Sequence, residues 1–326
     1  MDIAQIGKSA YLWLTPAGYG GDQIPSLARL LRHAGFESIM LHEINLSGWA
    51  SGDRLALVDA LRAEGVTPIL SVAVYGDDPA AEGRKAAALC AQYGLHAATF
   101  DLESKWDSKP NAPANTTTLF RAFRAAAPAG TLAGMCWWAR YRSPGGGTWH
   151  PVEVLRAGMD EADFGTPMAY HEGSTAEAAE SLLNASWRQW REVTDKPLVP
   201  AGRAYNGDGG TATPEAVRAF EAAARSLGAP GVTWWSVGSA LALPAVWDAL
   251  VALPQYARSA PEPEPQPDPQ PEPRPVPQPV PQPRPVPPPP VLTLDEMVRR
   301  LWEAHPELHD PPKKPVRRLY LPDVRA

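Results

Sequence analysis

The first 256 residues repeat one pattern about eight times: a short apolar run bounded by turn residues, then an amphipathic helical segment. Runs that are apolar on both faces are typical of strands buried on both sides of a parallel sheet. Successive runs lie roughly 25–35 residues apart, which is the length of a βα unit. The predicted strands are 10–14, 38–44, 67–75, 96–102, 132–138, 162–170, 197–204 and 232–237.

The helical segments between these runs have recognisable ends. Asp78 followed by Pro79 predicts an N-cap and a first helical residue, and Gly94 predicts the end of that helix. Asp53 and Ser174 are the predicted caps of two further helices. Eight βα units in about 250 residues predict an α/β fold of the (β/α)₈ (TIM barrel) type. A doubly wound open sheet is the alternative, but no Gly-rich phosphate-binding turn follows the first strand.

Composition changes abruptly after the predicted barrel. Residues 261–290 hold 17 prolines in 30 residues, which predicts an extended polyproline II linker, with a docking site for proline-binding modules as the alternative. Thr293 and Glu296 then form a capping box before an apolar helical stripe. One helix cannot bury that stripe alone, so we expect it to pack on the barrel, a second copy or a partner. The predicted domains are 1–256 (barrel), 257–291 (linker) and 292–326 (short helical, basic module).

Charge and cysteine content limit the classes of function. The formal net charge of −6 lacks the basic footprint of a nucleic-acid-binding protein. No uncharged apolar stretch approaches 18 residues, so we expect no membrane span. The first residues show no signal-peptide pattern, so we expect a protein made in the cytoplasm. If it acts outside the cell, another factor must export or release it, with lysis or association with a virion as the possible routes. Cys90 and Cys136 are expected to be buried rather than joined.

Carboxylate and aromatic side chains gather at the predicted carboxyl ends of the strands, where TIM barrels carry their active sites. Aromatic faces stack on sugar rings and carboxylates supply acid and base, although each tryptophan has packing in the core as its alternative role. We expect substrate contacts from Trp13, His42, Glu43, Tyr75, Trp137, His171, Glu172, Arg203, Tyr205, Trp234 and Trp235.

The sequence Phe100-Asp101-Leu102-Glu103 ends the fourth predicted strand. Residues two apart on a strand point to the same side, so Asp101 and Glu103 should both face the barrel interior or its mouth. Two carboxyl groups this close repel each other when ionised, which raises one pKa and suits a general acid. The alternative is a structural salt bridge with Lys105 or Arg140.

The strand-4 pair Asp101-x-Glu103, Met168-x-Tyr170 on strand 6 and a tryptophan on strand 8 resemble family 18 glycoside hydrolases, which are chitinase-like barrels. The strand-4 pair also resembles family 25 lysozymes. The resemblance implies that Glu103 is the acid/base, that Asp101 orients the substrate's 2-acetamido group and that Tyr170 hydrogen-bonds it. It further implies that Trp234 or Trp235 forms the floor of the −1 sugar subsite.

The chain departs from both family patterns at a few positions. Thr99 stands where family 18 has a further Asp, His171 stands where Asp or Asn usually follows the strand-6 Tyr, and the first strand ends without the family 25 Asp. These departures favour the alternative class of function, a non-catalytic glycan-binding or structural barrel of phage or virion type.

Other chemistries have weaker signals. His42 and His171 are scattered, and the first strand carries no H-x-H metal motif, so we expect no metal and no cofactor. Glu43 and Glu172 remain alternative second carboxylates of an acid/nucleophile pair. The sequence therefore predicts a glycoside hydrolase acting on N-acetyl-hexosamine polymers, most plausibly peptidoglycan as in lysins and muramidases.

Overall fold

The computed structural model describes residues 2–13, 23–44 and 51–256. Within them, eight parallel strands form a closed barrel in sequential order. Pairing of Gly7 in the first strand with Gly231 in the eighth closes the ring. Closure confirms the predicted (β/α)₈ barrel and excludes the open doubly wound sheet. The Pro-rich segment 257–291 and the C-terminal module 292–326 lie outside the described residues.

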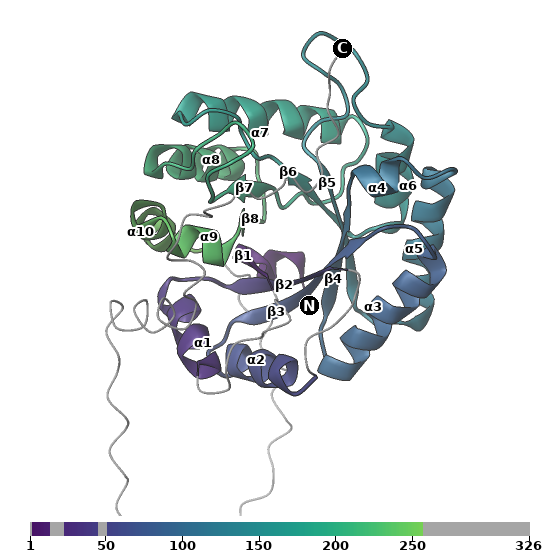
Figure 1. Cartoon of the computed structure of the whole chain (residues 1–326), viewed down its shortest axis with the longest axis horizontal. Helices are drawn as coiled ribbons and strands as arrows, with labels where there is room; N and C mark the ends of the chain where they lie inside the picture. Colours follow the sequence, from purple (N-terminus) through teal and green to yellow (C-terminus); the bar gives the residue numbers. More distant parts are fainter. Residues whose placement is uncertain (1, 14–22, 45–50, 257–326) are drawn as a thin grey trace, which may run out of the picture.

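Strands and helices alternate around the barrel (Figure 1). The strands are β1 (Gly7–Trp13), β2 (Ser38–Ile44), β3 (Thr67–Val74), β4 (Ala97–Leu102), β5 (Leu132–Trp138), β6 (Phe164–Met168), β7 (Ala201–Arg203) and β8 (Gly231–Trp235). The helices are α1 (Ile24–His33), α2 (Ser51–Ala63), α3 (Pro79–Tyr93), α4 (Ser104–Asp107), α5 (Ala112–Ala126), α6 (Val152–Glu161), α7 (Ala176–Arg191), α8 (Pro214–Ser226), α9 (Val237–Leu241) and α10 (Pro244–Ala252), with a 3₁₀ turn η1 (Ile3–Gln5) before β1.

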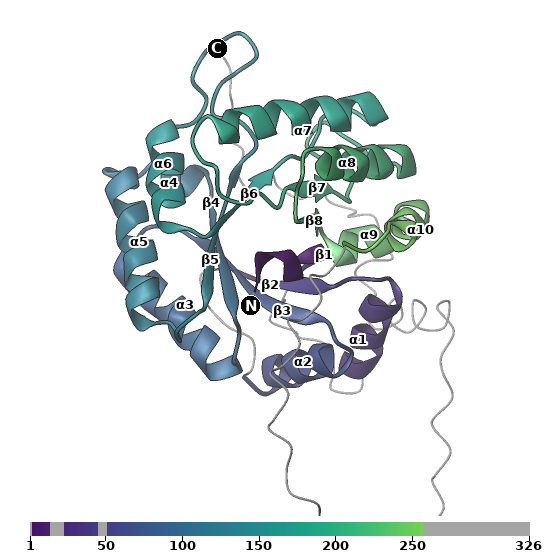
Figure 2. The same cartoon turned by 180° about the vertical axis from the view of Figure 1, so that it is seen from behind.

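The main apolar core lies between the strands and the ring of helices, which Figure 2 shows from the opposite end. Leu27, Leu30 and Leu31 of α1 share the face that packs on the strands, and each is at most 1% exposed. Burying a leucine side chain contributes about 1.5–3 kcal/mol. This outer layer therefore supplies most of the hydrophobic stabilisation that closes the barrel.

Helix ends follow the predicted chemistry with two corrections. Asp78 accepts a hydrogen bond from Ala81 N at 2.9 Å, and Gly94 ends α3 with a left-handed φ of 62°. The cap of α7 is Thr175 rather than Ser174, because its hydroxyl is the group that accepts from Ala178 N at 3.1 Å. The helix predicted to start after Asp53 begins at Ser51.

The seventh strand is shorter than predicted, three residues instead of eight. Pro197 and Pro200 lie in the predicted run and have no N–H to donate to a neighbouring strand. Leu198 between them makes only an isolated bridge to Gly165. The continuous strand β7 therefore begins only at Ala201, although Val199 N still donates to Gly165 O at 2.8 Å.

The barrel interior changes from apolar to polar along its axis. Its base is an apolar cluster that includes Tyr11, Met40, Ile69 and Phe164. Nearer the carboxyl ends of the strands, the inward side chains are hydroxyls, all fully buried: Ser71, Thr99, Thr166 and Thr233. Both cysteines are buried and free, as expected.

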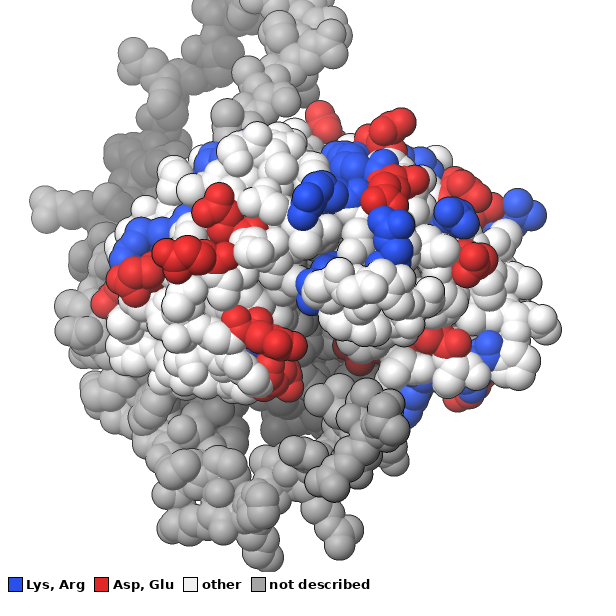
Figure 3. Space-filling model, turned by 90° about the horizontal axis from the view of Figure 1, so that it is seen from above, with Lys and Arg blue, Asp and Glu red and all other residues white. Residues whose placement is uncertain are grey.

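Acidic and basic side chains alternate over the face shown in Figure 3, and neither sign gathers into one large patch there. None of the helices in the described part of the chain combines the length and apolar character needed to cross a bilayer.

Candidate active site at the barrel mouth

The carboxyl ends of the strands and the loops after them form the barrel mouth, and β4 brings two carboxyl groups to it. Asp101 lies within β4 and is 7% exposed. Glu103 follows the strand in an extended conformation and is the residue before α4, so it points to the same side as Asp101. The structure thus brings the two predicted carboxyl groups together.

Asp101 is surrounded by groups that disfavour its negative charge. Burial raises its pKa well above the usual range, and the neighbouring Glu103 charge adds to the shift. A hydrogen bond with Cys136 acts in the opposite direction, and Tyr11 in turn donates to Cys136 Sγ at 3.5 Å. Asp101 Oδ1 is buried and has no hydrogen-bond partner among the described residues. This oxygen is available to a substrate group that enters the mouth.

Glu103 differs from Asp101 because its side chain reaches solvent. Its carboxyl group nevertheless sits among desolvating neighbours, and burial raises its pKa, with further contributions from the charges of Asp208 and Asp107. A carboxylic acid that keeps its proton towards neutral pH can protonate a leaving group. Glu103 therefore has the exposure and the electrostatic environment of a general acid.

Three tyrosines stand beside these carboxyl groups. Burial and the nearby Cys136 and Asp101 raise the pKa of Tyr170, which keeps its hydroxyl protonated as a donor. The Tyr205 ring meets the Tyr170 ring edge-on at 5.8 Å. Tyr75 directly follows β3, and burial together with the charges of Glu103 and Asp101 raises its pKa.

The opposite wall is aromatic and centred on Trp235. Its ring lies 4.9 Å from the His42 ring, 5.0 Å from that of Tyr11 and 5.4 Å from that of Trp13. Trp13 is 41% exposed, so this wall continues to the surface. His42 is held from the other side by a 2.9 Å hydrogen bond between its Nδ1 and Ser71 Oγ.

Several residues expected at the mouth lie elsewhere, because neighbours on a strand point to opposite faces. Trp234 is turned outward onto Phe220 of α8, with ring centroids 5.3 Å apart. Glu43 is also turned outward, and its carboxylate pairs with Arg54 of α2 at 2.6 Å. Trp137 is fully buried between β5 and the helices. In each of two pairs of adjacent candidates, one residue faces the interior: His42 rather than Glu43, and Trp235 rather than Trp234.

Arg203 and His171 are buried beneath the loops that follow β7 and β6. Arg203 donates through Nη1 to the carbonyls of Gly207 and Gly210, and its guanidinium lies 4.4 Å from the Tyr205 ring centroid. Burial and the Arg203 charge lower the pKa of His171. Glu172 is exposed on the rim and separate from this buried pair.

The cations proposed as salt-bridge partners of the carboxyl pair contact aromatic rings. Lys105 Nζ lies 3.9 Å from the centroid of the Tyr75 ring, and the Arg140 guanidinium lies 4.9 Å from that of Trp149. Within the described residues, no group of three His, Cys, Asp or Glu side chains is placed to hold a metal ion.

Sequence reasoning missed Asp107, His150 and Asp208. Asp107 lies four residues after Glu103, one helical turn further along, so its spacing was a usable signal. His150 and Asp208 lie in loops, where no sequence periodicity predicts their position. Asp107 accepts hydrogen bonds from two indoles and from His150. Asp208 accepts one from the Tyr205 hydroxyl at 2.7 Å.

A shallow cavity of about 400 Å³ lies at the other end of the barrel, against the amino ends of β3 and β4. Arg62, Thr67 and His96 are among its lining residues, and Asp2 is its one acidic group. It lacks the paired carboxyl groups and the stacked aromatic rings of the mouth. The mouth is therefore the better candidate for an active site.

No protein-family model matches the chain. No curated protein sequence matches it either. The fold, however, is similar to several solved structures. The spore cortex-lytic enzyme SleL of Bacillus cereus has a TM-score of 0.56 and 11% identity, over 76% of this chain and 73% of that one. A GH18 chitinase from Pseudoalteromonas aurantia has a TM-score of 0.55 and 12% identity, over 74% of this chain and 97% of that one.

A chitinase from Chromobacterium violaceum is similar at a TM-score of 0.52 and 14% identity, over 75% of this chain and 98% of that one. The chain has the fold of these glycoside hydrolases. This confirms the barrel fold that the residues of strands 4, 6 and 8 predicted by resemblance. The low sequence identities show that the similarity is distant. A shared barrel does not by itself fix an activity, which depends on the residues at the mouth.

Proposed function

We propose that the chain is a glycoside hydrolase that cleaves β-linked N-acetyl-hexosamine polymers, with peptidoglycan as its substrate. The observation that carries this proposal is the Asp101–Glu103 pair at the end of β4, two neighbouring carboxyl groups whose pKa values are both raised. They face an aromatic wall centred on Trp235, which suits the apolar face of a sugar ring.

In the proposed reaction, Glu103 donates its proton to the glycosidic oxygen as the bond from C1 to that oxygen breaks. The carbonyl oxygen of the substrate's own 2-acetamido group attacks C1 and forms an oxazolinium ion. The Glu103 carboxylate then takes a proton from water, whose oxygen attacks C1 and restores the acetamido group. Glu103 ends the cycle protonated, as it began.

The neighbouring residues have separate tasks in this scheme. The unpartnered Oδ1 of Asp101 accepts a hydrogen bond from the acetamido N–H and so aims its carbonyl oxygen at C1. The Tyr170 hydroxyl keeps its proton and donates a hydrogen bond to that carbonyl oxygen. Trp235 forms the floor beneath the sugar at the −1 subsite, with Trp13 extending the aromatic surface outward. Preorganised groups of this kind contribute most when the site excludes water.

The finer assignment to peptidoglycan draws support from two directions. Among the solved structures with this fold is a spore cortex-lytic enzyme as well as chitinases. The sequence also continues from the barrel into a long proline-rich segment and a short module. We propose that these tether and target the barrel to a cell wall, as in a lysin released by lysis or carried by a virion.

The experiment compares wild-type protein with Glu103→Gln on purified cell walls, followed by loss of turbidity, and on chitin oligosaccharides in parallel. Removing a general acid costs roughly 10²–10⁴-fold in rate, so we expect at least about a hundredfold loss. Glu180→Gln is the matched control, because it makes the same substitution at an exposed carboxylate on α7, outside the barrel mouth. Equal activity of wild type and Glu103→Gln contradicts the assignment of the acid.

The second candidate is a non-catalytic glycan-binding barrel, favoured by Thr99 and His171. Thr99 Oγ1 is buried without a hydrogen-bond partner among the described residues, where a further carboxylate would suit catalysis. Calorimetric binding of the same oligosaccharides, with no turnover by the wild type, would support this alternative and refute the hydrolase.

A further inference from the structure

A carboxylate outside the proposed catalytic pair collects three hydrogen bonds. Asp107 Oδ1 accepts from Trp137 Nε1 at 3.2 Å, and Oδ2 accepts from Trp138 Nε1 at 2.8 Å and from His150 Nδ1 at 3.0 Å. The His150 ring also stacks on the Trp138 ring, with centroids 4.4 Å apart and planes 14° apart. An ionised carboxylate only accepts hydrogen bonds, so it satisfies three donors where an amide cannot.

This cluster is connected directly to the backbone of the proposed acid. Asp107 N donates to Glu103 O at 3.0 Å, and Trp106 N donates to the same oxygen at 2.8 Å. Trp106 is itself buried, and its Nε1 donates to Thr116 Oγ1 of α5 at 2.8 Å. The turn that begins at Glu103 is thus fixed on one side by α5 and on the other by Asp107.

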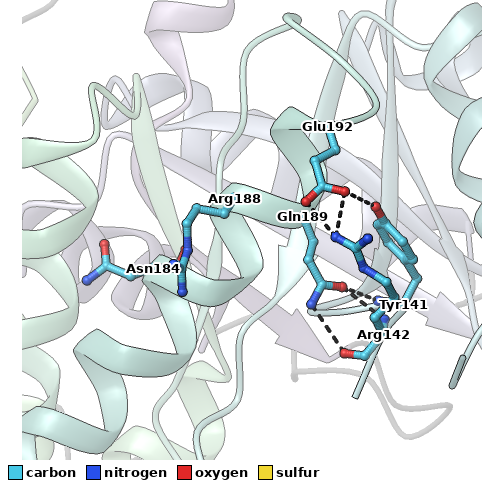
Figure 4. Close-up of polar contacts among 6 residues, drawn as sticks. All are labelled: Tyr141, Arg142, Asn184, Arg188, Gln189 and Glu192. Atoms are coloured by element: carbon cyan, nitrogen blue, oxygen red, sulfur yellow. Dashed lines mark hydrogen bonds and ion pairs between the residues drawn. The ribbon is translucent and has the colours of Figure 1, made fainter. Parts of the chain in front are cut away.

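The donors come from β5 and from the loop that follows it. The loop between β5 and α6 carries His150 and projects beyond the ring of helices next to α7 (Figure 1). Figure 4 shows how α7 holds this loop: Gln189 Oε1 accepts from Tyr141 N and Arg142 N at 3.0 and 2.9 Å. Glu192 accepts from the Tyr141 hydroxyl at 2.7 Å and pairs with the Arg142 guanidinium.

We propose that Asp107 is a positioning residue for the acid: its bonds to Trp137, Trp138 and His150, together with its backbone bond to Glu103, fix the turn that carries Glu103. The negative charge of Asp107 also raises the pKa of Glu103, which gives the proposal a measurable signature. This inference rests on the proposed function, in which Glu103 is the acid. In this inference, Trp137 and Trp138 hold Asp107 by hydrogen bonds instead of stacking on a sugar ring.

The effect of the Asp107 charge on the pKa of Glu103 can be distinguished from the effects of the other groups that face Glu103. Besides burial, the charges that raise the pKa of Glu103 are those of Asp208 and Asp107. Asp208 sits in an exposed loop, whereas Asp107 is 10% exposed and held by three donors. Within residues 2–13, 23–44 and 51–256, the titratable groups that interact with the Glu103 charge are, besides Asp107, Asp101 of β4, Cys136 of β5, Tyr75 after β3, Tyr170 after β6, and Tyr205 and Asp208 after β7.

The test is a pH titration of the Glu103 carboxyl by ¹³C NMR in the full chain, assigned by its loss in Glu103→Gln. We expect Asp107→Asn to lower the Glu103 midpoint by about half a pH unit or more, because a like charge is removed. In parallel, the alkaline limb of kcat/KM moves to lower pH, since less of the acid stays protonated. Asp77→Asn is the control, an exposed acid that pairs with Lys109 and should leave both unchanged.

A second variant keeps the inference testable if Asp107→Asn unfolds. His150→Phe preserves the ring over Trp138 and removes one donor, which leaves the Asp107 charge less compensated, so the Glu103 midpoint should rise by several tenths of a unit. An unchanged midpoint in folded Asp107→Asn, or in His150→Phe, overturns the inference. Because the titration needs no turnover, a shifted midpoint in a protein without glycosidase activity refutes the proposed function alone.

Discussion

His42 couples the stability of the barrel to pH. It is 3% exposed, its Nδ1 is bonded to Ser71, and three aromatic rings of the mouth surround it. Burial lowers the pKa of His42 to about 4, whereas an unperturbed histidine has a pKa of about 6.5. The imidazole therefore stays neutral in the folded chain under conditions that protonate it in the unfolded chain.

The sign and size of the effect follow from linkage. At pH 7 the residue is neutral in the folded chain and mostly neutral in the unfolded chain, so it contributes only about 0.2 kcal/mol. As pH falls through 6.5, the unfolded chain binds a proton that the folded chain does not, so folding loses free energy until both states are protonated below pH 4. With these two pKa values, the loss attributable to His42 is about 2 kcal/mol at pH 5.

Urea unfolding of wild type and His42→Gln at pH 7 and pH 5 measures this loss. The raw stability of the wild type is not the readout, because Asp101 and Glu103 have raised folded pKa values and favour folding as pH falls. The contributions of Asp101 and Glu103 cancel in the difference between the unfolding free energies of the wild type and His42→Gln. His42→Gln should be the less stable protein at pH 7, and its deficit should shrink by about 2 kcal/mol at pH 5.

His33 is an exposed histidine in the last turn of α1, and His33→Gln serves as the matched substitution. The difference in unfolding free energy between His33→Gln and the wild type should be the same at pH 7 and pH 5. An equal deficit of His42→Gln at both pH values contradicts a lowered pKa of His42 in the folded chain. That result would mean that water reaches the ring in the folded state and that the aromatic wall does not exclude it.

Two further substitutions test the packing that positions the mouth. Glu43→Gln leaves the buried Arg54 guanidinium without its counter-charge and should cost about 3–5 kcal/mol of unfolding free energy; Glu153→Gln, in an exposed pair, should cost at most about 1 kcal/mol in the same urea titration. Gly134→Ala places a methyl group 2.3 Å from the buried Phe164 ring and should cost about 1–3 kcal/mol. A melting temperature as high as that of Gly145→Ala, where the loop is open, would show that the ring can move aside.

The architecture could be predicted because each βα unit carries its own signals. Apolar runs, N-caps such as Asp78 and terminal glycines such as Gly94 are local features, and their eightfold recurrence fixes the closed barrel. The limits of the elements depended on finer chemistry. Pro197 and Pro200 shorten β7, and Thr175 competes successfully with Ser174 for the α7 cap.

The site was less predictable because the sequence does not reveal which face of a strand points inward. His42 and Glu43, like Trp234 and Trp235, are adjacent residues at a strand end, and either member could face the mouth. A shift of one residue moves every side chain to the other face. In the structure, Glu43 and Trp234 point to the helices, where Arg54 and Phe220 receive them, and this leaves the interior to His42 and Trp235.

The Asp107 cluster was beyond sequence reasoning for a different reason. Its donors Trp137, Trp138 and His150 lie 30, 31 and 43 residues further along the chain, about one βα unit away. Only the pairing of β4 with β5 brings them beside the turn after Glu103. In a closed barrel, the groups that act on a residue at one strand end therefore come from other βα units, as Asp208 does after β7 and as the donors to Asp107 do in β5 and the loop after it. Charged residues just past neighbouring strands are the places to look for such groups when only a sequence is known.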